Sequence, residues 1–163
     1  MPLNKNRELR DWQQKFIDAY AVSNAQKSLL VAAIGTGKSI TALSAARKKI
    51  ADGAVSNVIV VSDRRVLQEQ WRQVGKELDL ELAGSLSHLL TSHQQGAVIT
   101  YQSLNNLNNL DLLKANAKEK SSLFIFDEVY RYLNKAEEIS AEVTSLNKES
   151  LQKLALIWDT NYQ

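Results

Sequence analysis

The feature that most constrains this chain is a glycine-containing loop between an apolar run and an alanine-rich stretch. The loop, from Ala32 to Ser39, reads AAIGTGKS. The run before it, SLLVAA at 28–33, is typical of a strand covered on both faces, and a helical pattern follows at 41–52. The loop matches the phosphate-loop pattern G-x-x-x-x-G-K-[ST], with Ala32 in place of the first glycine. The order strand, loop, helix therefore predicts an α/β domain that binds phosphate.

Each remaining position of this loop has a chemical role. Gly35 and Gly37, with Thr36 between them, let the backbone turn tightly and bring its N–H groups close to phosphate oxygens. Lys38 supplies a positive charge for the β and γ phosphates, and the Ser39 hydroxyl is suited to Mg²⁺. The alternative is a glycine-rich turn that happens to contain Lys-Ser. The position of the loop inside an α/β pattern favours nucleotide binding.

Apolar runs with strand character alternate with helix-like stretches along the chain, which is the pattern of a parallel sheet flanked by helices. We find no internal repeat and no linker, so the prediction is one domain over 1–163. A short strand or turn and then a helix around Ser87 are predicted within 80–95, and 102–117 is predicted to be helical or partly irregular. The remaining predicted strands are 28–33, 57–62, 97–101, 123–126 and 154–158, and the remaining helices are 9–21, 41–52, 65–78 and 137–145.

Composition excludes several classes of protein. The chain contains no cysteine, so disulfides, thiol nucleophiles and cysteine metal sites are excluded. No apolar run reaches the roughly 18 residues that a membrane span needs, and the polar first ten residues lack the apolar core of a signal peptide. We therefore expect a cytoplasmic protein without a membrane partner. The formal charge of +2 neither requires nor excludes a nucleic-acid partner.

A second motif lies about ninety residues after the loop, where FIFDEVYR runs from Phe124 to Arg131. A carboxylate at the end of an apolar strand near a phosphate loop suits metal coordination, which points to Asp127 as a Mg²⁺ ligand. Glu128 would then polarise the attacking water as a general base. The alternative is an Asp-Glu pair that only complements a helix dipole.

With these two motifs, three further segments resemble a known family in their order along the chain. Together the five segments are similar to the first RecA-like domain of a superfamily 2 helicase or translocase of the DEAD/DEAH type. The segment VSDRRVLQEQ at 61–70 resembles the corresponding segment in the motor subunits of type I and type III restriction enzymes. The segments are LRDWQ at 9–13, AAIGTGKS at 32–39, NVIVVSDRRVLQEQW at 57–71, VITYQSL at 98–104 and DEVYR at 127–131.

This resemblance implies a RecA-like P-loop NTPase fold, an ATP cofactor with Mg²⁺, and a DNA partner, with RNA possible. It assigns adenine recognition to Gln13, catalysis to Lys38 and Glu128, and metal binding to Ser39 and Asp127. The nucleotide-binding set is completed by Gly35, Thr36 and Gly37. The resemblance places nucleic-acid contacts at Arg64, Arg65, Thr100, Gln102 and Ser103. The alternatives are a solvated helix turn for the two arginines and a helix cap for Gln102 and Ser103.

The chain departs from the family pattern in three places. Tyr130 stands where the family has a residue that links nucleotide to nucleic acid, and Thr160 alone matches the motif expected after the last strand. The family also builds its ATP cleft between two RecA-like domains, the second of which supplies an arginine finger. We therefore expect weak ATP binding and slow hydrolysis, with the second domain supplied elsewhere. The alternatives are a non-enzymatic module that binds nucleic acid or a motor protein and, with less support, a small kinase.

The tryptophans and histidines carry no separate chemistry in this interpretation. Trp12, Trp71 and Trp158 are expected to pack in the core or at its edge. His88 and His93 are expected at the surface, since no acidic partner stands at ligand spacing.

Overall fold

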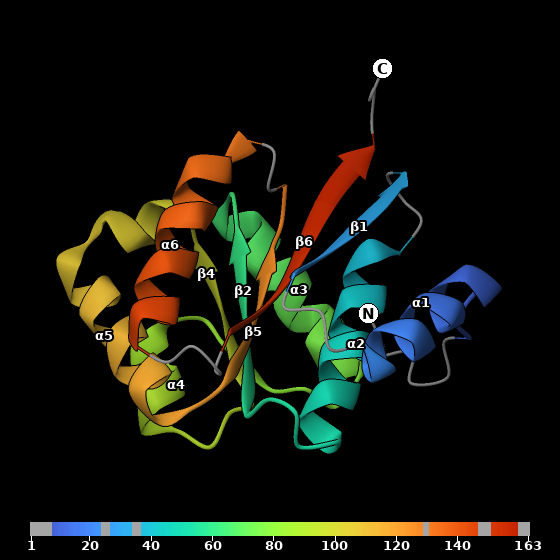
Figure 1. Ribbon diagram of the computed structural model, residues 1–163, viewed down its shortest axis with the longest axis horizontal. Coiled ribbons are helices and arrows are strands. Elements are labelled where there is room, and N and C mark those ends of the chain that lie inside the picture. The colour runs from blue at the N-terminus through green and yellow to red at the C-terminus, as the bar shows by residue number, and fades with distance from the viewer. Residues whose placement is uncertain (1–7, 24–26, 34–36, 129–130, 147–150, 160–163) are drawn as a thin grey trace.

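The computed structural model describes residues 8–23, 27–33, 37–128, 131–146 and 151–159. Within them the chain forms a six-stranded sheet in which every paired strand is parallel, in the order β1-β6-β5-β2-β4-β3 (Figure 1). The strands are β1 (Lys27–Ala33), β2 (Asn57–Ser62), β3 (Leu82–Ala83), β4 (Gly96–Thr100), β5 (Ser122–Phe126) and β6 (Leu151–Asp159). The predicted α/β class with a parallel sheet is confirmed.

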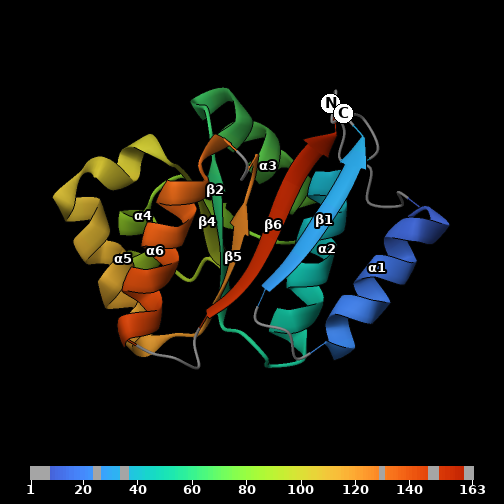
Figure 2. The same ribbon diagram turned by 45° about the horizontal axis from the view of Figure 1, so that its top comes forward.

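Helices cover both faces of this sheet (Figure 2). They are α1 (Asp11–Val22), α2 (Lys38–Ala51), α3 (Arg65–Glu77), α4 (Leu86–Thr91), α5 (Leu107–Glu119) and α6 (Leu133–Leu146), with a short 3₁₀ helix, η1 (Gln102–Asn105). α1, α2 and α3 pack on one face and α4, α5 and α6 on the other. No helix among the described residues is both long enough and apolar enough to span a bilayer.

The central strand β2 shows why the sequence forms this sandwich. Val58 and Val60 pack toward the α1–α3 face, whereas Ile59 and Val61 pack toward the α4–α6 face. All four are fully buried, because successive side chains of a strand point to opposite sides. Burying such a side chain contributes about 1.5–3 kcal/mol. A continuous β-branched run is therefore stable only where helices cover both faces of the sheet.

The order of the strands places the motifs at one edge. β6 lies between β1 and β5, and the loops that follow β1, β2, β4 and β5 all leave the carboxyl edge of the sheet. Open parallel sheets bind their ligands at this edge, next to the point where the strand order reverses. The predicted last strand is confirmed as β6, three residues longer at its start than the predicted 154–158.

At the opposite, amino edge, three buried polar side chains close a ring of hydrogen bonds. Asn57 donates to Asn116 at 2.9 Å, Asn116 donates to Ser122 at 3.0 Å, and Ser122 donates back to Asn57. Each is at most 2% exposed. The ring joins the starts of β2 and β5 to the end of α5 and satisfies polar groups that would otherwise be costly to bury.

Three helix starts differ from the sequence prediction. α1 begins at Asp11, two residues late, and α2 begins at Lys38, three residues early. α6 begins at Leu133, four residues before the predicted start, because its first turn combines an exposed leucine with a single buried residue, Ala136, and carries no periodic signal. The segment 102–117 divides at Asn106, whose side chain accepts the Asn108 N–H at 2.8 Å and starts α5.

Candidate functional site

The phosphate-loop motif enters α2 through a left-handed glycine. Gly37 has φ 88° and ψ 39°, and a Cβ there would lie 2.6 Å from Nε2 of Gln13. Glycine is therefore required by both conformation and space. Lys38 is the first helical residue and is only 2% exposed, and Ser39 is half-buried. The start of α2 thus places its first N–H groups and its positive dipole end beside an ammonium, which suits an anion.

Gln13 from α1 is hydrogen-bonded to this loop. Its Nε2 donates to the Gly37 carbonyl at 3.1 Å and to Thr41 Oγ1 at 3.0 Å, and its Oε1 accepts the Arg10 N–H at 2.7 Å. The Thr41 hydroxyl donates to the same Gly37 carbonyl at 2.7 Å. Gln13 is 4% exposed. The predicted adenine-recognising residue therefore contacts the phosphate loop directly, and the predicted Gly35 and Thr36 lie outside the described residues.

Asp127 stands at the carboxyl end of β5 and is 1% exposed. Its Oδ1 accepts the Glu128 N–H at 3.0 Å, and its Oδ2 accepts the indole N–H of Trp71 at 3.3 Å. Its own N–H donates to the Val61 carbonyl at 3.0 Å. These contacts hold the carboxylate in one orientation at the sheet edge. Trp71 was expected only to pack, and it does pack at 2% exposure, but it also binds the proposed metal ligand.

Glu128 adopts φ 49°, a left-handed conformation that is uncommon for a residue with a side chain. Such conformations persist where the surrounding structure fixes them, and they concentrate at functional sites. The Glu128 carboxylate lies 3.7 Å from the Arg131 guanidinium, and the Arg131 N–H donates to the Glu128 carbonyl at 3.0 Å. Tyr130 lies outside the described residues.

The donor set fits a magnesium nucleotide. Among the described residues no group of three or more His, Asp or Glu side chains could hold a metal by itself. Mg²⁺ in nucleotide sites commonly uses one or two carboxylates together with phosphate oxygens and water. Asp127 and the Ser39 hydroxyl could supply such ligands, and Lys38 could supply the cation for the phosphates. The residues therefore suit a metal that arrives with its nucleotide.

A groove of about 370 Å³ lies beside this edge and contains three of the five predicted nucleic-acid contacts, Arg65, Thr100 and Ser103. The Ser103 N–H donates to Thr100 Oγ1 at 3.1 Å, and the Ser103 hydroxyl donates to the Thr100 carbonyl at 2.7 Å. Ser103 is thus held by local bonds to Thr100, whereas the alternative of a helix cap was made for Gln102 and Ser103, and η1 has Tyr101 at its N-cap without a side-chain cap bond. The remaining lining residues are Gln68, Glu69, Arg72, Gly84, Ser85, Leu86, Ile99 and Asn109.

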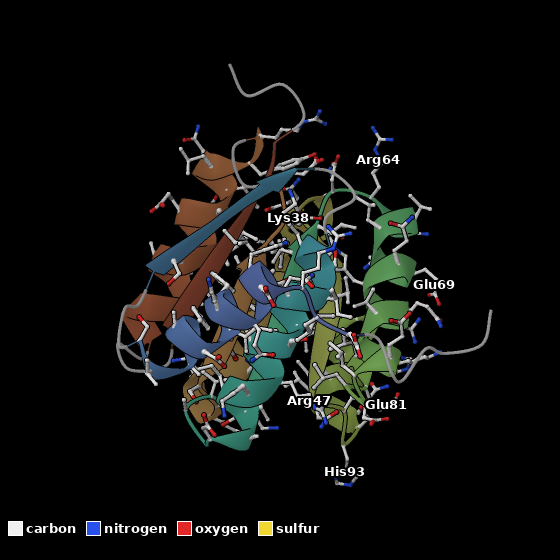
Figure 3. All side chains as sticks on the ribbon, turned by 90° about the vertical axis from the view of Figure 1, so that its right-hand side faces the viewer. Lys38, Arg47, Arg64, Glu69, Glu81 and His93 are labelled. Carbon is white, nitrogen blue, oxygen red and sulfur yellow. The ribbon has the colours of Figure 1, made fainter. Side chains whose placement is uncertain are left out.

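The other two predicted contacts lie outside this groove. Arg64 precedes α3, has an exposed side chain, and places its Nε 3.7 Å from Oδ2 of Asp63. Gln102 begins η1 and donates to Asp63 and to Tyr132 at 3.4 and 3.3 Å. In Figure 3, Lys38 and Arg64 lie at one end of the molecule, and Arg47, Glu81 and His93 at the opposite end.

Sequence reasoning missed several residues of this edge. Tyr132 and Thr41 carried no motif signal, and Tyr101 lay in the VITYQSL segment without a predicted role, because their partners are distant in sequence. Tyr101 donates its hydroxyl to the Asp127 carbonyl at 2.7 Å and stacks on Tyr132. The two histidines are exposed, as predicted. Trp12 packs half-buried against the core, whereas the side chain of Trp158 is outside the description.

A family model described as "Type III restriction enzyme, res subunit" matches residues 6–157, nearly the whole chain. The chain belongs to this res-subunit family. Curated relatives include the uncharacterized proteins Rv2917 of Mycobacterium tuberculosis, 28% identical over 129 residues, and ML1624 of Mycobacterium leprae, 27% identical over 128 residues. Each match covers 77% of this chain and 21% of the relative, so the chain spans about a fifth of their length.

Solved structures confirm the fold of this res-subunit family member as a first RecA-like domain. The SWI2/SNF2 ATPase core of Sulfolobus solfataricus, solved with double-stranded DNA, matches 96% of this chain and 33% of its own at TM-score 0.68 and 20% identity. The UvsW helicase of bacteriophage T4 matches 96% of this chain and 54% of its own length, at TM-score 0.67 and 16% sequence identity. The Type ISP restriction-modification enzyme LlaGI, solved as a nuclease-deletion mutant, matches 92% of this chain and 17% of its own length. Its TM-score is 0.60 and its sequence identity 17%.

Proposed function

We propose that this chain is the ATP-binding domain of a nucleic-acid-dependent ATPase of the helicase or translocase type. The observation that carries the proposal is the convergence of three motifs at one sheet edge. Gln13 is hydrogen-bonded to the loop that begins α2, Lys38 is the first residue of that helix, and Asp127 ends β5. Glycine-rich turns occur in many folds, but this combination with the family match favours nucleotide hydrolysis.

Each residue has a separate role in this proposal. Lys38 binds the β and γ phosphates, and the N–H groups around Gly37 and the start of α2 bind their oxygens. Ser39 and Asp127 hold Mg²⁺, which neutralises phosphate charge when the nucleotide is bound. Glu128 accepts a proton from the attacking water.

The groove beside α3 is the proposed binding surface for a nucleic-acid backbone. Arg65 and Arg72 supply positive charge, and Thr100, Ser103 and Asn109 supply hydroxyl and amide groups, a mixture that suits phosphate and sugar oxygens. Glu69 reduces the positive charge of this groove, since its carboxylate lies 3.3 Å from the Arg72 guanidinium. SWI2/SNF2 and LlaGI were solved with DNA or a DNA mimic, which supports DNA as the polymer.

We further propose that a second RecA-like domain, on another part of the protein or another chain, completes the catalytic cleft. The described domain corresponds to 33% of the SWI2/SNF2 core and 54% of UvsW. An arginine finger from a second domain is worth about 10³–10⁵ in rate. The domain by itself is therefore expected to bind ATP weakly and to hydrolyse it slowly.

The proposal is tested by calorimetric titration of Mg-ATP into the wild type and Lys38→Ala, alone and with single- or double-stranded DNA. We expect binding in the wild type, loss of at least tenfold in affinity in the variant, and tighter binding with DNA. Absence of nucleotide binding under every condition would overturn the ATPase proposal. DNA binding that persists without any nucleotide binding would instead support a non-enzymatic nucleic-acid module.

A further inference from the structure

One carboxylate at the sheet edge connects segments from three parts of the chain. Asp63 follows β2, and its side chain is only 11% exposed. Its Oδ1 accepts the hydroxyl of Tyr132 and the amide of Gln102, while its Oδ2 faces Arg64 at 3.7 Å. Gln102 Nε2 also lies 3.3 Å from the Tyr132 hydroxyl, which closes a triangle of polar contacts.

The same cluster reaches the backbone of Asp127, the proposed metal ligand, through stacked rings. Tyr132 lies against Tyr101 with ring centroids 4.1 Å apart and planes 9° from parallel. Tyr101 is 2% exposed and donates its hydroxyl to the Asp127 backbone carbonyl at 2.7 Å. Along the chain, Tyr132 also follows Arg131, whose N–H binds the Glu128 carbonyl. Tyr132 thus bridges Asp63 to both Asp127 and Glu128.

The bond from the Tyr132 hydroxyl to Asp63 is stronger than an ordinary surface hydrogen bond. A hydroxyl or amide that donates to a carboxylate forms a charge-assisted bond, roughly twice as strong as a neutral one. The bond to Asp63 is also the main reason that the pKa of the Tyr132 phenol is raised. Burial of Tyr101 and the nearby Asp127 carboxylate raise the pKa of its phenol as well. Both rings therefore remain neutral donors over the physiological pH range.

We propose that Asp63, Tyr132 and Tyr101 are positioning residues that couple nucleic-acid binding to the catalytic edge. This inference rests on the proposed function and extends its nucleic-acid surface from the groove to Arg64 and Gln102, the two predicted contacts that lie outside the groove. A phosphate that binds Arg64 or draws Gln102 away changes the hydrogen bonding of Asp63. The Tyr132 hydroxyl and its stack on Tyr101 then transmit that change to Asp127 and Glu128. Coupling of this kind requires that each ligand favour the same arrangement of the cluster.

The test removes one oxygen atom. Tyr132→Phe deletes the hydroxyl but keeps the ring stack, and the matched control is Tyr20→Phe, because the buried Tyr20 hydroxyl on α1 has no hydrogen-bond partner in the described structure. The Kd of Mg-ATP is measured with and without a saturating single-stranded DNA oligonucleotide. We expect DNA to tighten ATP at least about fivefold in the wild type and in Tyr20→Phe. In Tyr132→Phe the ratio of the ATP Kd without DNA to the ATP Kd with DNA should fall toward one. The affinity for ATP alone and the affinity for DNA alone should each change less than about twofold.

Further variants and outcomes decide the inference. Asp63→Ala should lower the ratio as Tyr132→Phe does, and the double variant should lose no more than either single one. A wild-type ratio in Tyr132→Phe, or a wild type that binds both ligands with no mutual effect, overturns the coupling. A wild type that binds neither ligand overturns the proposed function instead. In that case NMR of the ligand-free protein tests whether the cluster connects Asp63 to Asp127. Tyr132→Phe should shift the amide resonances of Arg64 and Asp127, and shifts confined to residues 131–134 overturn the proposed connection.

Discussion

At the scale of single residues, the site is defined by polar groups that are held in place before any ligand binds. Gln13 binds the loop before α2, Trp71 binds one oxygen of Asp127, and Glu128 adopts a left-handed backbone conformation. In the proposed reaction, such preorganisation would spare the reorientation of these groups. Lys38 begins α2 and Glu128 follows β5, so the proposed binding and catalytic roles lie on different parts of the fold.

We predict that Glu128→Gln preserves ATP affinity within about twofold but lowers turnover by about 10²–10⁴, since an amide cannot accept the proton of the attacking water. Turnover is measured as phosphate release, with DNA present and with the second domain supplied where it is known. The matched control is Glu138→Gln on α6, whose carboxylate also faces a cation three residues away, Lys135 at 3.7 Å. Loss of ATP binding in Glu128→Gln would contradict the assigned role.

At the scale of elements, the close approach of β4 to β2 depends on a glycine. Gly96 pairs with Val58, and a Cβ at Gly96 would lie 2.2 Å from the Val58 carbonyl oxygen and 3.0 Å from the Leu82 side chain. The backbone oxygen cannot move aside alone, because β2 is hydrogen-bonded to strands on both sides. β4 therefore begins its pairing with β2 through a residue without a side chain.

We predict that Gly96→Ala lowers the free energy of unfolding by about 3 kcal/mol, in the range of overpacked cores. Urea denaturation measures the loss. Gly84→Ala serves as the control, because its Cβ would meet only Arg72 at 3.7 Å, an ordinary contact. Equal stability of the two variants would show that the strands separate more easily than this packing implies.

At the scale of the whole molecule, stability comes from two apolar layers, one on each face of the sheet. Tyr20 of α1 lies in the layer formed with α2 and α3, where it is 4% exposed and lies under the Lys49 ammonium. Burial raises the pKa of the Tyr20 phenol from 10.0 to about 12. The unfolded chain therefore loses this proton at a lower pH than the folded domain does.

We predict that the free energy of unfolding falls as pH rises from 10 to about 12, because ionisation then favours the unfolded state. Tyr20 should account for up to about 3 kcal/mol of that fall, from 1.36 kcal/mol for each unit of pKa. Urea denaturation of Tyr20→Phe across this range should show a shallower decline than the wild type. Identical declines would mean that the phenol is not buried in solution as it is in this structure.

The sequence by itself determined the local elements wherever their pattern was strong. β2 has the predicted bounds, Asn57–Ser62, and α3 differs from its prediction by one residue. A dense β-branched run and a complete amphipathic period are local properties, so no distant contact is needed to specify them. The start of α6 was misplaced because its first turn has no such pattern. The roles of Lys38 and Asp127 were likewise proposed from adjacent residues alone.

Only the tertiary structure decided which elements and side chains meet. The sheet order inserts β6 between β1 and β5, and it brings Trp71 to Asp127 and Tyr132 to Asp63 across 56 and 69 residues. An apolar pattern states which face of an element is buried but does not name the partner that buries it. The polar partner of a buried tryptophan or tyrosine has no local signature at all. That choice is made when the whole sheet assembles, because buried donors must then find acceptors on whichever strand lies beside them.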